Sequence, residues 1–228
     1  MFEEAPREDI LEIYVSEGAC EKICAQTSLD GMEYIKVRDD IFGKMSDTRT
    51  PQGILTVMRR REHALNDILG QENPLIVVLD NLNDPGNLGT IIRTGEGAGV
   101  TGVIMGNGTV DIYNPKVIRS TMGSIYRVPF VYVNNLRDCV LKMHELKINT
   151  YAAHLNGETY YDGPDFCEPT AFLIGNEARG LCRELADCAK CRVKIPMEGR
   201  VESLNAAIAS ALLMYEAHKQ RWKCEKNF

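Results

Sequence analysis

The chain has 228 residues, a formal net charge of −6 and 44% hydrophobic residues, so it is long enough for one large domain or two small ones. No apolar run approaches the length of a membrane span, and the N-terminus Met-Phe-Glu-Glu-Ala-Pro does not resemble a signal peptide, so we expect a cytoplasmic protein without a membrane partner. The acidic balance argues against non-specific coating of nucleic acid but is compatible with a local basic site.

Residues 1–64 are expected to form a small α/β unit. Strands are predicted over 10–15, 34–37 and 53–58, and helices over 16–27, capped by Ser16, and over 39–45. Arg59-Arg60-Arg61 then opens a charged segment, and residues 65–74 have the composition of a linker. The three arginines could contact phosphate, or they could be the solvated face of that linker.

From Leu75 the pattern of apolar residues becomes regular. The run Leu75–Leu79 is continuously apolar, which is typical of a strand buried on both faces of a parallel sheet. Asp84 and Pro85 predict the cap and first position of a helix, and Ser203 predicts the cap of the last helix. Strands are expected over 75–79, 100–105, 129–133, 149–155, 171–174 and 192–195, and helices over 85–98, 115–121, 136–146, 181–187 and 203–221. This alternation predicts an α/β domain over 75–228, with a parallel sheet flanked by helices.

One glycine motif does not fit its usual role. Gly97-Ala-Gly99-Val-Thr-Gly102 matches the dinucleotide fingerprint G-x-G-x-x-G, which acts only where it follows a strand and opens a helix. Here the motif ends a predicted helix and leads into a strand. We therefore interpret it as a helix C-cap and turn, and a nucleotide-dependent oxidoreductase has no other support.

The eight cysteines, in a chain without a signal sequence, favour a reducing compartment and free thiols. Cys188-Ala-Lys-Cys191 has the spacing of a zinc half-site, and Cys182 is near it. No second pair lies close in the sequence, so no metal site is expected.

A first candidate site stretch runs from Asp84 to Arg93, where a strand leads through a turn into a helix. Gly86 and Gly89 would let the backbone approach a partner closely. Asn87 and Arg93 are six residues apart, nearly two helical turns, so we expect them to face the same region. The ordinary alternatives are a turn residue for Asn87 and a surface charge for Arg93.

Two later stretches also follow strands. In Gly175-Asn176-Glu177-Ala-Arg-Gly180, glycines bound a loop that would expose amides and carbonyls to an adenosine or ribose edge; a capped turn is the alternative. In the stretch from Ile195 through Met197, Gly199, Ser203 and Leu204 to Asn205, a strand leads through a polar loop into a helix. In open α/β proteins such loops bind ligands.

Together the three stretches closely resemble motifs one, two and three of the SpoU (TrmH) family, which are RNA ribose 2′-O-methyltransferases of the SPOUT superfamily. The resemblance covers the chain from about Leu75 onward. Residues 1–64, with Thr50-Pro-Gln-Gly53-Ile-Leu, resemble the small ribosomal-protein-like α/β RNA-binding domain that often precedes it. The familiar start of that domain is absent, so we expect it to be incomplete at its N-terminus.

The resemblance implies a SPOUT-type fold with a C-terminal trefoil knot, a homodimer, and S-adenosyl-L-methionine bound in the knot. It implies rRNA or tRNA as the substrate. The cofactor-binding residues would be Gly175, Asn176, Ile195, Met197, Gly199 and Leu204. The catalytic and RNA-positioning set would be Asn87, Arg93, Glu177, Ser203 and Asn205.

The expected chemistry suits these residue types. A ribose hydroxyl must lose its proton, whereas a sulfonium methyl donor is already activated, so alignment and alkoxide stabilisation remain as the protein's task. The resemblance implies Arg93 as the base. Because free arginine stays protonated, Arg93 would either lose its proton in a special pocket or stabilise the alkoxide while phosphate or water takes the proton.

The last helix is predicted to build the dimer as well as the pocket. Small and large apolar residues occupy more than one of its faces up to Glu216, and Leu213 is expected at the interface between two copies. Packing of the second face within the same chain is the alternative. For function, the alternative is an RNA-binding module of the same fold without catalysis.

Overall fold

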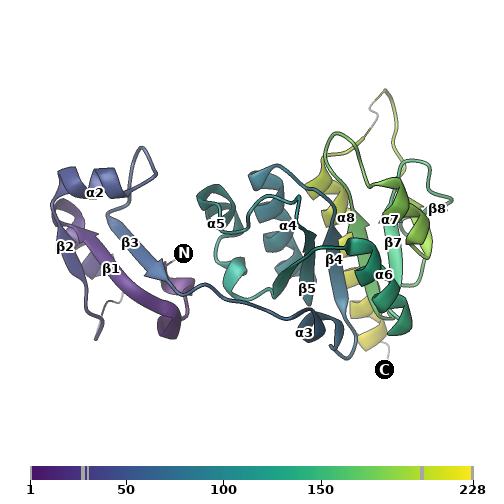
Figure 1. The fold of residues 1–228 in the computed structure, drawn as a ribbon, viewed down its shortest axis with the longest axis horizontal. Helices are drawn as coiled ribbons and strands as arrows, with labels where there is room; N and C mark the ends of the chain where they lie inside the picture. The colour runs from purple at the N-terminus through teal and green to yellow at the C-terminus, as the bar shows by residue number, and fades with distance from the viewer. Residues whose placement is uncertain (1, 27–28, 30, 201–202, 227–228) are drawn as a thin grey trace. The chain divides into compact units, whose positions relative to one another are not determined.

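The computed structural model describes residues 2–26, 29, 31–200 and 203–226. By its contacts the chain divides into two compact units, residues 1–61 and 62–228 (Figure 1). None of the described helices combines the length and apolar character that crossing a membrane requires.

The first unit is built on the strand β1 (Ile10–Ser16). This strand pairs in parallel with β2 (Ile35–Val37) and antiparallel with β3 (Ile54–Met58). Side chains of β1 and of the helix α1 (Cys20–Gln26) form its core, and α2 (Asp39–Met45) follows β2. Three short 3-10 turns span Phe2–Glu4, Arg7–Asp9 and Glu17–Ala19.

Ser16 lies at the N-cap position of the 3-10 turn Glu17–Ala19, but its side chain does not make the expected cap hydrogen bond. It ends β1, and its hydroxyl hydrogen-bonds the carboxylate of Asp39, which also accepts the backbone N–H of Gly18 at 2.9 Å. The Ser16 bond, aided by the Gly18 amide, lowers the pKa of Asp39. Ser16 therefore ties β1 to α2, and the helix predicted from it begins only at Cys20; its predicted end, Thr27, lies outside the described residues.

The second unit contains a seven-stranded sheet in which every pairing is parallel. The strand order is β6-β5-β4-β9-β7-β10-β8. The bounds are β4 Leu75–Leu79, β5 Gly102–Gly106, β6 Phe130–Val133, β7 Asn149–Ala153, β8 Thr159–Tyr160, β9 Thr170–Ile174 and β10 Cys191–Lys194. The expected parallel α/β architecture is confirmed, and only the two-residue edge strand β8 was not foreseen.

Helices cover both faces of this sheet (Figure 1). One face carries α4 (Pro85–Ala98), α5 (Pro115–Thr121) and α8 (Ala206–Lys226). The other carries α3 (Leu65–Leu69), α6 (Leu136–Glu145) and α7 (Arg183–Cys188). The central strand β4 shows why: Val77 and Leu79 point into the first core, Ile76 and Val78 into the second, and all are fully buried.

The segment 65–74, expected to be a linker, is in part structured. It contains α3, whose Ile68 and Leu69 are buried in the second core. A Cβ at Gly102 would lie 2.4 Å from Ile68, so α3 packs directly on β5. These apolar contacts outweigh the polar composition that suggested a linker.

The last helix begins three residues later than predicted. Asn205, not Ser203, caps it: its Oδ1 accepts the backbone N–H of Ala207 at 2.9 Å and of Ile208 at 3.3 Å. Both residue types are good caps, so the sequence alone did not separate them.

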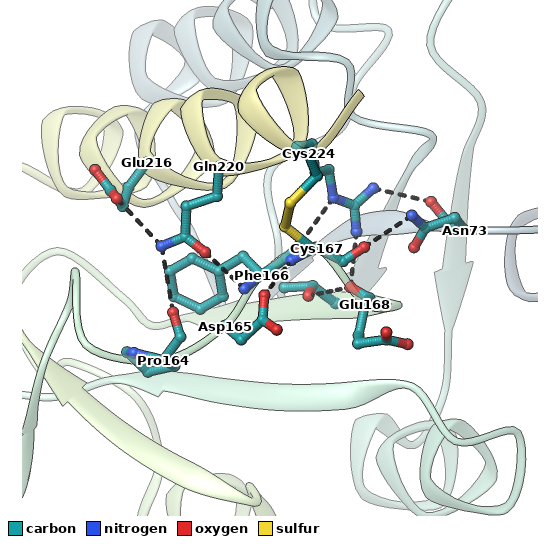
Figure 2. The surroundings of a disulfide bond; sticks show 11 residues. Asn73, Pro164, Asp165, Phe166, Cys167, Glu168, Glu216, Gln220 and Cys224 are labelled. Carbon is teal, nitrogen blue, oxygen red and sulfur yellow. Dashed lines mark hydrogen bonds between the residues drawn. A yellow bond between two sulfur atoms is a disulfide. The ribbon is translucent and has the colours of Figure 1, made fainter. Parts of the chain in front are cut away.

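The far end of α8 is fastened to the segment that leads into β9, as Figure 2 shows. Cys224 forms a disulfide with Cys167, which corrects the expectation of free thiols for this pair. The guanidinium of Arg221 donates to the carbonyl oxygens of Phe166, Asn73, Pro74 and Glu168 at 2.9–3.0 Å. The side chain of Gln220 accepts the backbone N–H of Phe166 at 2.8 Å and donates to the carbonyl oxygen of Pro164 at 3.2 Å. We call this set of contacts the α8 clamp.

The other six cysteines are free thiols: Cys20, Cys24, Cys139, Cys182, Cys188 and Cys191. Within the described part of the chain, no group of three or more Cys, His, Asp or Glu side chains could hold a metal ion.

Candidate active site

A pocket of about 420 Å³ lies beyond the carboxyl ends of the strands, within the size range of small-molecule sites. Three loops and one helix line it. They are residues 153–156 after β7, residues 174–181 at the end of β9, Ile195, Met197, Ser203 and Leu204 after β10, and the first two turns of α8. Ile174, Val193 and Leu213 supply apolar wall, and the loops supply backbone and polar groups.

The loop after β9 is closed on itself. Asn176 and Gly180 exchange two backbone hydrogen bonds of 3.1 and 2.8 Å, and Asn176 Oδ1 accepts the amides of Ala178 and Arg179. A Cβ at Gly175 would lie 1.9 Å from the backbone nitrogen of Leu181, so only glycine permits this approach. The loop therefore presents a fixed backbone surface to the pocket.

Glu177 connects this loop to the start of α4. Its carboxylate accepts the backbone N–H groups of Asn83 at 3.1 Å and Asp84 at 2.9 Å, and the Nδ2 of Asn87 at 3.0 Å. Partial burial alone would raise the pKa of Glu177, but the bonds from Asn87 and the two amides outweigh it and lower the pKa. Glu177 is thus held as a carboxylate.

Asn87 in turn hydrogen-bonds Asn205 at the start of α8. Its Oδ1 accepts the Nδ2 of Asn205 at 3.0 Å, while its own Nδ2 donates to Glu177. The amide orientations follow from their partners, because Asn205 Oδ1 already caps α8 and a carboxylate can only accept. We call the chain Asn205–Asn87–Glu177 the amide relay; it joins all three motifs.

The residues predicted to bind the cofactor largely meet at the pocket. Gly175, Asn176, Ile195, Met197 and Leu204 line it, as do Glu177 and Ser203 from the predicted catalytic set. Gly199 is not among the described lining residues; it lies in a turn at φ 82°. The prediction missed the wall made by residues 153–156, whose composition carries no recognisable motif, and it gave Arg179 no role.

Arg93 is not brought to this group. It is exposed on α4, and no hydrogen bond or ion pair of its guanidinium occurs within the described residues. Six helical positions amount to a rotation of about 600°, which leaves Asn87 and Arg93 roughly 120° apart around the helix. The expectation that both face the same region is therefore not met within one chain.

Of the glycines in motif one, Gly89 lies where two helices cross, and Gly86 lies next to the side chain of the cap residue Asp84. A Cβ at Gly89 would lie 2.3 Å from the Cβ of Ser120, so Gly89 lets α4 and α5 cross closely. The rejected fingerprint behaves as expected: Gly99, at φ 80°, is the C-cap of α4, and its N–H donates to Glu96.

Comparison with known proteins identifies the group to which this site belongs. A family model described as "SpoU rRNA Methylase family" matches residues 74–215. The chain is a member of the SpoU rRNA methylase family. The relationship inferred from three short motifs is thereby confirmed, and with it the class of enzyme, a methyltransferase.

Two curated relatives of this SpoU family member are named as ribosomal RNA enzymes. The chain is 34% identical over 186 residues to the 23S rRNA (guanosine(2553)-2′-O)-methyltransferase RlmP of Bacillus subtilis (strain 168), covering 81% of this chain and 72% of the relative. It is 30% identical over 250 residues to the human mitochondrial rRNA methyltransferase 3, covering 84% of this chain and 59% of the relative.

Solved structures of SpoU proteins share the fold. An AdoMet-bound rRNA methyltransferase from Sinorhizobium meliloti aligns with a TM-score of 0.79 at 33% identity, over 92% of this chain and 80% of that one. The SpoU methyltransferase AviRb from Streptomyces viridochromogenes, in complex with AdoMet, aligns with a TM-score of 0.79 at 28% identity, over 94% and 84%. The predicted cofactor, S-adenosyl-L-methionine, is thereby confirmed at the level of the family.

Proposed function

We propose that the chain transfers a methyl group from S-adenosylmethionine to a ribose 2′-hydroxyl in a structured rRNA or tRNA. The observation that carries the proposal is the amide relay beside the pocket, because it brings the three sequence motifs together at one edge of the sheet. The names of the relatives support RNA as the substrate.

The pocket suits the methyl donor. Gly175 lets the loop backbone fold closely against Leu181, and the backbone groups of Gly175, Ile195 and Leu204, which line the pocket, can meet the edges of a nucleoside. When bound, S-adenosylmethionine supplies a methyl group that its sulfonium already activates. The chain has then only to orient the acceptor and to manage the proton.

The chain's own residues divide this task. Ser203 lines the pocket with an exposed hydroxyl that can hydrogen-bond the ribose. The amide relay fixes the first turn of α8 against the loop of Glu177, so Ser203 and Leu204 keep their place. Arg93 stabilises the developing alkoxide by its charge, since a guanidinium is a poor proton acceptor. Water or an RNA phosphate then takes the proton.

The active form in this proposal is a homodimer. Ile208, Leu212 and Tyr215 of α8 are 52%, 37% and 49% exposed and recur at helical spacing. A second copy would cover this stripe. Leu213, which we expected at the interface, is fully buried within the chain, so the interface prediction moves to the neighbouring face. Assembly of two copies also offers Arg93 a site that one chain does not give it.

Three further parts of the proposal concern organisation. The C-terminal part of the second unit would form the trefoil knot that the family resemblance implies. The first unit would bind RNA, with the run Arg59 to Arg61 as the candidate for phosphate contacts; Arg61 also pairs with Asp9 and Glu8. A cytoplasmic location would bring the enzyme to its RNA.

The test is transfer of labelled methyl groups from S-adenosylmethionine to ribosomal and transfer RNA from cells that lack the protein. We expect one ribose in one of the two RNA classes to become methylated, detected by its resistance to alkaline hydrolysis. Binding of RNA without transfer would favour the alternative, a module of the same fold without catalysis. Methylation of a base instead of ribose would overturn the proposed reaction.

A further inference from the structure

Of the two charged side chains that line the pocket, one has hydrogen-bond partners within the described residues and the other has none. Among the described lining residues the aspartate, glutamate, lysine and arginine side chains are those of Glu177 and Arg179 alone. The carboxylate of Glu177 is engaged by Asn87 and by two backbone amides. The guanidinium of Arg179, by contrast, makes no hydrogen bond or ion pair within residues 2–26, 29, 31–200 and 203–226.

The backbone of Arg179 is nevertheless held firmly. Its N–H donates to Asn176 Oδ1 at 3.1 Å, and the paired backbone bonds between Asn176 and Gly180 close the loop on both sides of it. Gly175 is packed against Leu181 at the base of the loop. Arg179 is therefore fixed at the edge of the pocket by its main chain, while its side chain is exposed and uncommitted. This arrangement suits a side chain that engages a ligand.

We propose that Arg179 binds the carboxylate at the amino-acid end of S-adenosylmethionine and so distinguishes the methyl donor from nucleosides that lack this end. The inference rests on the proposed function. The adenosine part is uncharged and can be met by apolar wall and backbone groups, so it needs no cation. The amino-acid end carries a carboxylate, whose two oxygens match the planar fork of a guanidinium.

The test compares two ligands in three proteins by calorimetry. S-adenosylhomocysteine carries the amino-acid end, and 5′-methylthioadenosine does not. The proteins are the wild type, Arg179→Gln and the control Arg183→Gln, which removes the same charge from a side chain that is 95% exposed and paired with Asp187. Arg179→Lys is added because it keeps the charge but loses the fork.

We expect Arg179→Gln to weaken S-adenosylhomocysteine binding about 10-fold or more, as for loss of a charge-assisted pair, and to leave methylthioadenosine binding unchanged. The affinity of Arg179→Lys for S-adenosylhomocysteine should lie between those of the wild type and Arg179→Gln. Arg183→Gln should bind both ligands like the wild type. Equal affinity of wild type and Arg179→Gln for S-adenosylhomocysteine would overturn the proposal.

A second outcome would also overturn it: unchanged affinity for both ligands together with a shallower salt dependence of RNA binding would assign Arg179 to an RNA phosphate. Failure of the wild type to bind either ligand would instead overturn the proposed function itself. The two failures are therefore distinguishable in one set of titrations.

Discussion

Asn87 donates a hydrogen bond of 3.0 Å to Glu177, a residue 90 positions later in the chain. The same carboxylate accepts the backbone amides of Asn83 and Asp84, which belong to the turn just before α4. The Nδ2 of Asn176 approaches the same carboxylate at 3.5 Å, so both of its oxygens accept hydrogen bonds. A glutamine would turn an N–H group toward some of these donors, so the position requires a carboxylate.

Glu177→Gln should therefore lower the free energy of unfolding at pH 7 by about 1 kcal/mol, the worth of a partly exposed charge-assisted hydrogen bond. The folded-state pKa of Glu177 is lowered, so its stabilisation is complete above the ordinary value of 4.5 and is lost as the pH falls through the folded pKa. The difference between wild type and variant should shrink below about pH 4.5, measured by urea unfolding. Glu184→Gln, on the exposed surface of α7, is the control. If the difference in unfolding free energy between wild type and Glu177→Gln stayed constant with pH, Glu177 would not act as a stabilising carboxylate.

Asn205 has two separable roles, as the cap of α8 and as the end of the amide relay. Asn205→Asp keeps an oxygen for the cap but turns a second oxygen toward Asn87 Oδ1, so we expect near-normal stability and impaired methyl transfer. Asn205→Ala loses both and should cost roughly 1–2 kcal/mol of unfolding free energy. Thermal melts and transfer assays on both variants check this. Wild-type turnover by Asn205→Asp would show that the relay is dispensable.

Arg93→Ala tests the role of the exposed arginine of α4. Methyl transfer should fall about 10²–10⁴-fold, the usual contribution of a charge or proton-transfer group. Binding of S-adenosylhomocysteine should persist, because Arg93 does not line the pocket. Arg137→Ala on α6 removes another exposed arginine, one that pairs with Glu184, and should retain activity. Near wild-type turnover of Arg93→Ala would remove the residue from the catalytic set.

Leu212 and Leu213 are adjacent in sequence but differ in exposure, 37% against 0%. Leu212→Arg should convert a dimer to a monomer in analytical ultracentrifugation while leaving the fold intact. Leu213→Arg should instead unfold the domain, because it buries an unpaired charge. A Leu212→Arg protein that sediments as a dimer would exclude this face of α8 as the interface.

The disulfide of the α8 clamp closes a long loop, since its cysteines are 57 residues apart in sequence. Cys224→Ser should lower the stability of the oxidised protein by about 2–4 kcal/mol. In reducing buffer the wild type and the variant should unfold at the same denaturant concentration, because only the bond distinguishes them. Cys24→Ser, at an exposed free thiol, is the control. An unchanged midpoint on reduction of the wild type would contradict the bond.

The parts of the fold that local chemistry determines were predictable. The cap at Asp84 and the proline at the first position fixed the start of α4, and the continuous apolar run of β4 indicated a sheet covered on both faces. The start of α8 was misplaced because Ser203 and Asn205 are equally good caps, and only the relay to Asn87 favours the second.

Contacts between residues far apart in the chain could not be predicted from local sequence patterns. Nothing near Cys167 indicates that its partner is Cys224, and eight cysteines allow many pairings. The burial of Leu213 and the exposure of Leu212 depend on the rotation of α8 against the sheet, which a helix that is apolar on several sides leaves open. Within the site, the motifs identified the two main pocket loops, whereas the wall at 153–156 became visible only in three dimensions.

The amide relay has a consequence for the order of events during synthesis. Asn87 and Asn205 are 118 residues apart, so at translation rates of about 5–20 residues per second roughly 6–24 s pass between the making of one partner and the other. During that interval α4 and its cap can form from residues already made, but the amide of Asn87 lacks its acceptor Glu177 for the first 90 residues and its donor Asn205 for all 118. The amide relay is therefore completed late, after all seven strands of the sheet have been made.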